Sequence, residues 1–196
     1  MKCFDHLFER FPEFETDRCI LRQIKQSDLG NLHELFSDKD NVKCFGLDIM
    51  KDIIEANKTL QQLKALFDKK LGFAWVIALK ENNKMIGLIN YTCWFRRFYR
   101  CGIRHSLKRE YWDQGYLTEI FPPVIEFGFN KMKLHRIESI VNPQADLSVQ
   151  LVRNFGFFQE ALLKDYSYNF VNQKFDDNYL FALLNNKNTE YHELFM

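Results

Sequence analysis

The spacing of hydrophobic and polar positions divides the first half of the chain into strands and helices. Alternating β-favouring residues predict a first strand over 19–25, and two further runs, 73–80 and 85–94, predict a hairpin around the polar turn between them. Ser27 is a candidate N-cap for a short helix after the first strand. Isoleucines and leucines at helical intervals over 48–70 predict an amphipathic helix or a broken pair of helices.

The second half of the chain also alternates between segments with strand-like spacing and segments with helical spacing of hydrophobic residues. Its predicted elements are, in order, a strand over 99–107, a helix over 116–132, a strand over 134–141, a helix over 145–157 and strands over 157–168 and 175–184. The resulting order, β-α-α-β-β-β-α-β-α-β-β, predicts an α/β fold with a mixed sheet and helices on both of its faces. No repeat, low-complexity tract or flexible linker interrupts it, so we expect a single domain over 1–196.

Composition and charge narrow the classes of partner. A chain of 196 residues that is 46% apolar can bury a core of its own. Its formal net charge of +1 gives no overall field for nucleic acid or an anionic membrane, so we expect neither as a specific partner. The five cysteines are scattered and never spaced as Cys-x-x-Cys, which favours free thiols over disulfides or a zinc site. The charged N-terminal run lacks a signal-peptide apolar region, and we therefore expect a cytoplasmic protein.

One stretch, REYWDQGYLTEIF over 109–121, raises a question of chemistry. A basic, strand-like run reaches a single glycine, Gly115, and passes directly into an apolar helical run. A plain turn is one interpretation. The other is a loop whose backbone N–H groups, at the start of a helix, hold a phosphate group.

Four segments, in order, carry a resemblance to a known family. They are FPEFETDRCILRQIKQSDL from residue 11, FAWVIALKENNKMIGLINY from residue 73, LHRIESIV from residue 134 and LVRNFGFFQEALLKDY from residue 151. Together they resemble the GCN5-related N-acetyltransferases (GNAT), and within them the branch that acetylates the N-terminal alanine or serine of ribosomal proteins. The resemblance covers about 11–184, with short extensions at either end.

The resemblance implies a reaction and a cofactor. Members of this family transfer acetyl from acetyl-CoA to a primary amine by direct attack, without a metal. Their fourth and fifth strands, here 99–107 and 134–141, splay apart, and the pantetheine arm lies between them. The CoA pyrophosphate lies on a loop before the next helix.

That loop falls on 110–115 of this sequence. Gly115 matches the family's last glycine, whereas Glu110 and Asp113 place acids where the family has Gln or Arg and a glycine. Asp tolerates the left-handed region, so Asp113 is expected to keep the turn. The cofactor-binding residues implied by the resemblance are Ser106, Leu107, Asp113, Gln114, Gly115, Tyr116, Leu117, Thr118, Asn142 and Ser148.

Pro122 and Pro123 fall inside the helix that follows the loop. Each removes a backbone donor, so the carbonyls of Thr118 and Glu119 lose their usual partners. We therefore predict a kink or a loosened turn at the prolines.

Three residues are candidates for the chemistry. His105 lies on the fourth strand, and an ordinary imidazole pKa near 6.5 suits it to accept the amine proton. The resemblance implies that Ser148 protonates the departing thiolate, and that Tyr166, after the sixth strand, is an acid. Each has a simpler interpretation as a solvent-facing, core or helix-start residue. The family's asparagine before Ser148 is Ala145 here, although Asn142 and Asp146 are close, and Asp165 stands near a glutamate that this chain lacks.

Two aromatic and basic features have alternative interpretations. The basic stretch 95–109 is a strand edge protected by charge, our preferred reading, or a nucleic-acid surface, or a site for a CoA phosphate or an acidic peptide. Phe8, Phe11 and Phe14 form a hydrophobic brace or an exposed contact site, and we prefer the brace.

These observations lead to one expected function and two alternatives. The expected acceptor is the N-terminal amine of a protein, because the resemblance implies it. The alternatives are a small-molecule amine such as a polyamine or an aminoglycoside, and a non-catalytic acyl-CoA-binding module. The sequence leaves open whether the protein is a monomer or a homodimer.

Overall fold

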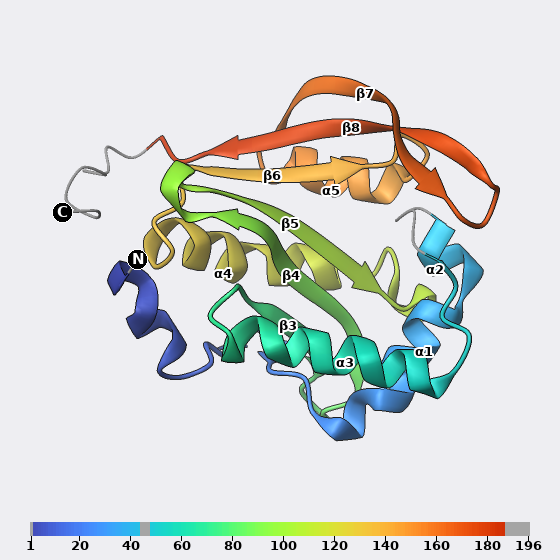
Figure 1. Cartoon of the computed structure of the whole chain (residues 1–196), viewed down its shortest axis with the longest axis horizontal. Coiled ribbons are helices and arrows are strands. Elements are labelled where there is room, and N and C mark those ends of the chain that lie inside the picture. Colours follow the sequence, from blue (N-terminus) through green and yellow to red (C-terminus); the bar gives the residue numbers. More distant parts are fainter. Residues whose placement is uncertain (1, 44–47, 187–196) are drawn as a thin grey trace.

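The computed structural model describes residues 2–43 and 48–186, and its centre is one eight-stranded sheet (Figure 1). The strands lie in the order β1-β2-β3-β4-β5-β6-β8-β7. Their bounds are β1 Phe14–Glu15, β2 Cys19–Arg22, β3 Ala74–Leu79, β4 Met85–Phe95, β5 Arg100–Leu107, β6 Arg136–Val141, β7 Phe158–Asn169 and β8 Lys174–Leu184. All neighbouring pairs are antiparallel except β5 and β6, which are parallel.

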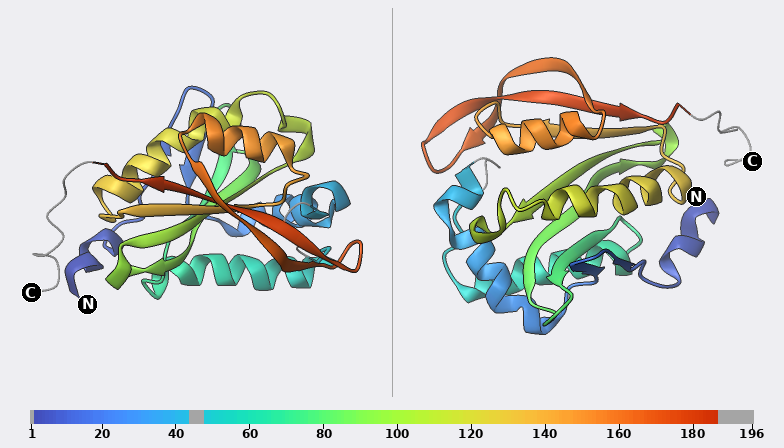
Figure 2. Two further views of the ribbon diagram at one scale, coloured as in Figure 1. Left: turned by 90° about the horizontal axis from the view of Figure 1, so that it is seen from above. Right: turned by 180° about the vertical axis from the view of Figure 1, so that it is seen from behind.

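The helices cover both faces of this sheet, as the sequence predicts. They are α1 Leu29–Ser37, α2 Lys39–Lys43, α3 Ile53–Asp68, α4 Tyr116–Asn130 and α5 Asp146–Asn154. Strand β3 shows how the faces divide: Trp75 and Ile77 join the core under α4 and α5, while Val76 and Ala78 join the core under α1 and α3. Figure 2 shows α4 and α5 together on one side of the sheet and α3 on the other. None of the described helices is long and apolar enough to cross a bilayer.

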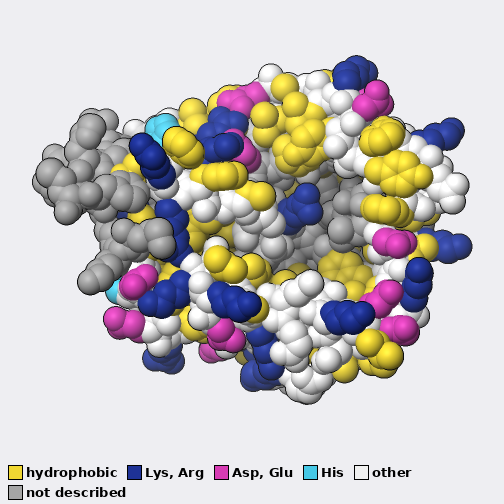
Figure 3. Space-filling model, viewed as in Figure 1, with side chains coloured by type: hydrophobic (Ala, Val, Ile, Leu, Met, Phe, Trp, Pro, Cys, Tyr) yellow, Lys and Arg dark blue, Asp and Glu magenta, His cyan; other side chains and the backbone are white. Residues whose placement is uncertain are grey.

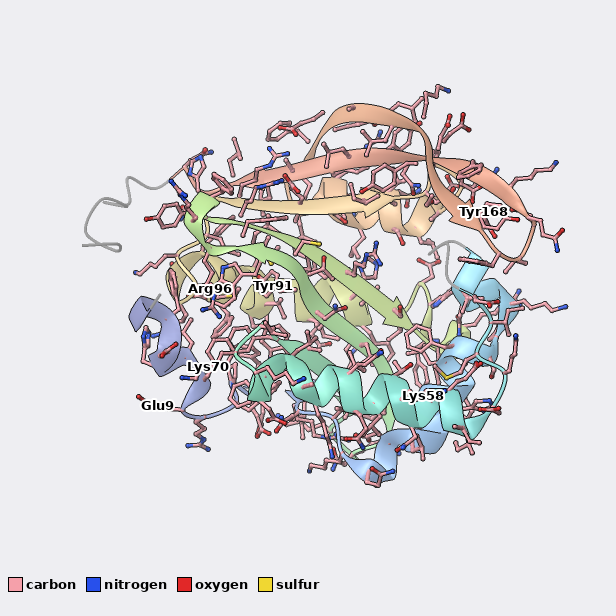
Figure 4. The ribbon with its side chains drawn as sticks, in the orientation of Figure 1. Glu9, Lys58, Lys70, Tyr91, Arg96 and Tyr168 are labelled. Carbon is pink, nitrogen blue, oxygen red and sulfur yellow. The ribbon has the colours of Figure 1, made fainter. Side chains whose placement is uncertain are left out.

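The N-terminal aromatic residues form the predicted brace. A 3-10 helix, η1 (Lys2–Phe8), brings Phe8 against Phe73, with ring centroids 4.9 Å apart and nearly parallel. Phe11 and Phe14 both pack against Trp75, at 6.1 Å and 5.7 Å. Arg96 lies over the Trp94 ring at 4.3 Å and donates to the Lys70 carbonyl, and Figure 4 shows Arg96 and Lys70 beside this segment.

The first helix does not begin as predicted. Ser27 lies inside a short 3-10 turn, η2 (Gln26–Asp28), and Asp28 precedes α1 in the N-cap position. The Asp28 carboxylate instead accepts two hydrogen bonds of 2.8 Å from Arg22, and both side chains are buried. It also accepts from the backbone N–H of Lys25, so the chain turns away from the sheet and β2 ends earlier than predicted.

The predicted helix over 48–70 is shorter in the structure. Helix α3 begins after Asp52, whose carboxylate accepts from the N–H groups of Ile54 and Glu55. This is a side-chain N-cap, which satisfies donors that have no partner within the helix.

Helix α4 continues without a break through Pro122 and Pro123. Its packing brings it close to β4, since the Tyr91 hydroxyl donates to the Val124 carbonyl at 2.7 Å (Figure 4). A Cβ at Gly128 would lie 2.3 Å from that hydroxyl, so only glycine allows this approach.

Candidate active site

Strands β5 and β6 are paired at one end and separate at the other. Only Arg100, Cys101 and Gly102 of β5 pair with β6, opposite Arg136, Ile137 and Glu138. From Ile103 onward, β5 continues its pairing with β4 but has no pairing with β6. The splay that the family resemblance implies is therefore present.

A small cavity of about 50 Å³ occupies the gap between the separated strands. It is lined by Ile103, Arg104, His105, Ser139, Ile140, Val141, Asn142, Ala145, Ser148, Tyr166, Ser167 and Asn178. The structure thus brings together all three candidate catalytic residues and Asn142. They come from β5, from the turn between β6 and α5, from α5 itself and from β7.

A larger cavity of about 570 Å³ extends from the same gap toward the start of α4. It is lined by Asn41, His105, Leu107, Tyr111, Trp112, Asp113, Gly115, Tyr116, Leu117, Thr118, Gln144, Ala145, Asp146, Leu147, Ser148, Gln150, Leu151 and Asn154. His105, Ala145 and Ser148 line both cavities, so the two spaces meet at these residues. Most of the residues expected to bind the cofactor lie on these walls.

Two of the expected cofactor-binding residues line neither cavity. Ser106 is buried and lies opposite Leu88 of β4. Gln114 is turned back, because its side-chain amide donates to the Glu110 carbonyl at 2.6 Å.

The loop before α4 has the left-handed backbone conformations that were expected of it. Asp113 has φ +55°, in the left-handed region expected for it, and Gly115, the N-cap of α4, has φ +76°. A side chain at Gly115 would be strained in that conformation. The first N–H groups of a helix have no partner within the helix, and the positive end of its dipole favours anions.

The two acids of this loop are placed differently. The Glu110 carboxylate forms an ion pair with Lys84 at 3.5 Å, and Glu110 lines neither cavity. Asp113 does line the larger cavity. Of these two carboxylates, therefore, only that of Asp113 lies where it would repel a pyrophosphate.

Arg18, just before β2, holds this loop in place. Its guanidinium Nε lies 2.8 Å from the Glu119 carboxylate in the first turn of α4, and its Nη1 donates to the Gln114 carbonyl at 3.0 Å. The same guanidinium lies 4.1 Å from the Tyr116 ring centroid. The N-terminal strand and the loop, about 100 residues apart, are thus fixed to each other.

His105 does not have the ordinary pKa assumed from the sequence. The residue is buried, and its ring contacts the Phe121 ring of α4 at 5.3 Å. Burial lowers its pKa to about 4. The imidazole is therefore neutral at neutral pH, and its conjugate acid is too strong to hold a proton there.

Tyr166 lies within β7, inside the strand predicted over 157–168, and its expected position after that strand is wrong. Its place is a bulge, since Leu163 pairs with Asn178 and Ser167 with Asp176, which leaves three residues of β7 opposite one of β8. Asp165 takes φ +49° in this bulge, and its N–H donates to Asp177 at 3.0 Å. The distortion places the half-exposed Tyr166 on the wall of the small cavity.

Asn142 lines the small cavity and also makes hydrogen bonds that stabilise the fold. Its amide donates to the Asp176 carboxylate at 3.1 Å, and its oxygen accepts from the Gln144 N–H at 2.8 Å. These bonds fix the turn between β6 and α5, which carries Ser148.

The interpretation of the basic stretch 95–109 as a protected edge is wrong. Strand β5 lies inside the sheet, between β4 and β6. Its basic residues are used individually: Arg100 binds Glu138 at 3.1 Å, and buried Lys108 binds Asn31 at 2.8 Å and Glu34. Arg104 is exposed and lines the small cavity, a location that the sequence did not single out.

The described residues contain no group of three His, Cys, Asp or Glu side chains that could hold a metal ion. Cys19, Cys93 and Cys101 are free thiols. Burial raises the pKa of Cys19 to about 11 and that of Cys101 further. The side chains of Cys3 and Cys44 lie outside the described part of the chain.

Comparison with known proteins agrees with this geometry. A family model described as an acetyltransferase (GNAT) domain matches residues 18–158. The uncharacterized N-acetyltransferase YoaA of Bacillus subtilis (strain 168) is 32% identical over 158 residues, covering 81% of this chain and 89% of YoaA.

Two solved structures are similar in fold. The ribosomal-protein-S5-alanine acetyltransferase from Vibrio fischeri has a TM-score of 0.76 at 24% identity, covering 90% of this chain and 98% of that chain. The spermidine N-acetyltransferase from Vibrio cholerae, in complex with CoA and spermine, has a TM-score of 0.74 at 16% identity, covering 84% and 94%.

Fold and site thus define an acyl-transferring α/β protein with a splayed sheet. The chain belongs to the GNAT family and is an acetyl-CoA-dependent N-acetyltransferase.

Proposed function

We propose that the protein transfers acetyl from acetyl-CoA to the N-terminal amine of a protein, with the reaction centred where the two cavities meet. The observation that carries this proposal is the unpaired end of β5 and β6, which joins the small cavity to the larger one. The pyrophosphate would bind the backbone of the loop from Asp113 to Thr118. The pantetheine would then lie between β5 and β6 and present its thioester near Ser148.

The reaction requires one bond to form and one to break. The neutral amine attacks the thioester carbonyl carbon, a C–N bond forms, and the C–S bond breaks to release the CoA thiolate. We assign Ser148 as the donor that protonates this thiolate, because it lines both cavities, and water returns a proton to its hydroxyl in the same step. The amine proton leaves through water past Tyr166, since a His105 conjugate acid with a pKa of about 4 would not retain it. His105 then shapes the wall as a neutral ring.

The open face of the sheet supports a protein as the acceptor. Figure 3 shows this face hollowed between the β7–β8 side and α3, with a basic side chain visible in the hollow. Similarity to the ribosomal-protein-S5-alanine acetyltransferase points to an N-terminal amine. Similarity to the spermidine acetyltransferase makes a polyamine the competing acceptor.

Two measurements test the proposal. Acetyl-CoA and CoA should each raise the Tm, and failure of both to do so would refute cofactor binding. Turnover should then be measured on Ala- or Ser-starting peptides with neutral following residues, on spermidine and on an aminoglycoside. We expect the peptides to have the highest kcat/KM. Faster turnover of a small amine would identify that class instead, and binding without any turnover would indicate a non-catalytic module.

A further inference from the structure

Arg104 lies on the open side of the sheet, opposite the helices that form the larger cavity. Its neighbours along β5, Ile103 and His105, face α4: Ile103 belongs to the core beneath that helix, and His105 contacts Phe121. Because successive side chains of a strand point to opposite faces, Arg104 points to the other side. There it is exposed and lines the small cavity at the proposed reaction centre.

The strand neighbours of Arg104 on that face carry no charge. Directly across on β4 lies Asn90, and the diagonal neighbours are Leu88 and Thr92. On β5 itself, the residues two positions away are Gly102 and Ser106. No carboxylate occurs among the described residues that line the small cavity. The side chain of Arg104 also has no ion pair or hydrogen bond within the described part of the chain.

The nearby basic residues differ from Arg104 in this respect. Arg100 and Arg136 both bind Glu138, Lys108 binds Glu34, and Lys164 binds Asp177. Each of these has a carboxylate partner within the fold. Of these five basic side chains, only that of Arg104 has no carboxylate partner, so its guanidinium is available to a ligand.

We propose that Arg104 recognises a carboxylate of the acceptor, and that the preferred acceptor is a protein N-terminus with Asp or Glu in its first few residues. This inference rests on the proposed function and adds the acceptor's charge to it. A guanidinium binds a carboxylate through two parallel hydrogen bonds, and a partly enclosed site strengthens the contact. A polyamine, by contrast, would bring its second cationic nitrogen toward Arg104.

Three peptides that differ only at positions 2 and 3 test the inference. Each starts with Ser, followed by two Asp, two Gly or two Lys. The natural protein should favour the Asp peptide over the Gly peptide by about tenfold in kcat/KM, the effect of one charge-assisted hydrogen bond. Arg104→Gln should remove that preference, and Arg104→Glu should reverse it toward the Lys peptide. Raising the salt concentration should weaken the preference, as screening requires.

A matched control and a cofactor measurement complete the test. Arg97→Glu changes another exposed arginine of the same basic stretch that lines neither cavity, and it should leave the peptide preference unchanged. The CoA Kd should be the same in all variants. Equal turnover of the three peptides by the natural protein would overturn the inference while leaving the proposed function intact.

Two further outcomes also decide against it. Loss of CoA affinity in Arg104→Gln with an unchanged peptide preference would assign the residue to the cofactor. Free aspartate acetylated faster than the Asp peptide would place the carboxylate on a small molecule. If no peptide is turned over at all, the proposed function fails first.

Discussion

The two ends of the β5–β6 pair differ in what holds them. At the paired end, hydrogen bonds join the strands, and Arg100, Arg136, Glu138 and Glu160 form a charged network across them. At the open end, the strands have no such bonds, and residues from β5, β6, α5 and β7 face shared space. Backbone groups at the open end are available to a ligand that can pair as an added strand. A fixed end therefore supports the open end, where we propose that acetyl-CoA binds.

Filling the open end should have the largest effect. Ala145 lines both cavities, so Ala145→Trp places an indole where they meet. We expect CoA affinity to fall more than about 100-fold, or about 2.7 kcal/mol, measured by calorimetry. Phe158→Trp, on the exposed face of β7, is the control and should bind CoA normally. Normal CoA binding by Ala145→Trp would place the cofactor elsewhere.

Replacing His105 tests whether the wall between the cavities is neutral. Its pKa falls from 6.5 unfolded to about 4 folded, so between these values the unfolded state binds more protons. Stability therefore declines as the pH falls from about 6.5 to 4. From pH 7 to pH 5 we expect His105 to contribute about 2 kcal/mol of this loss.

Urea unfolding at the two pH values measures this contribution. His105→Gln should lose about 2 kcal/mol less on acidification than the natural protein. An identical pH dependence in both proteins would show that His105 titrates normally in the folded state.

Ser148→Ala tests the chemistry at the open end. Loss of the thiolate's proton donor should lower kcat about tenfold, while the CoA Kd stays within about twofold. Ser139→Ala is the matched control, because Ser139 lines the same small cavity from β6 without reaching the larger one. Equal kcat losses in the two variants would remove Ser148 from its assigned role.

Weakening the paired end should have the smallest effect. Glu138 accepts hydrogen bonds from Arg136 at 2.7 Å and Arg100 at 3.1 Å. Because the network is partly exposed, Glu138→Gln should cost about 1 kcal/mol of unfolding free energy and leave CoA affinity unchanged. Glu160→Gln, which touches only Arg136 of the two, should cost less. A large loss of CoA affinity in Glu138→Gln would show that the two ends are coupled.

Much of the fold can be predicted from the sequence because the spacing of nearby hydrophobic residues determines each helix and strand. Periodicity placed both helices of the second half and the hairpin within a few residues of their observed bounds. Asp113 kept the left-handed turn, as its short polar side chain allows. Ser27 failed as an N-cap because Arg22 and Asp28, six residues apart, form a buried pair that no local pattern shows.

The site was less predictable because it depends on neighbours in space. The family resemblance supplied the splayed strands, and eight of the ten cofactor-binding residues that it implied line the cavities. It did not supply the bulge that turns Tyr166 into the gap, the burial that lowers the pKa of His105, or the clamp from Arg18. Arg104 looked like one arginine among many in 95–109, and what distinguishes it is its place on the wall of the small cavity together with its lack of an ion pair in the described part of the chain.

A crystal structure with CoA bound tests the central claim most directly. We predict the pantetheine between Ile103–Leu107 and Ser139–Asn142, and the pyrophosphate within hydrogen-bond distance of backbone N–H groups of the loop from Asp113 to Thr118. CoA bound outside this gap, or β5 and β6 found paired along their full length with CoA present, would contradict it.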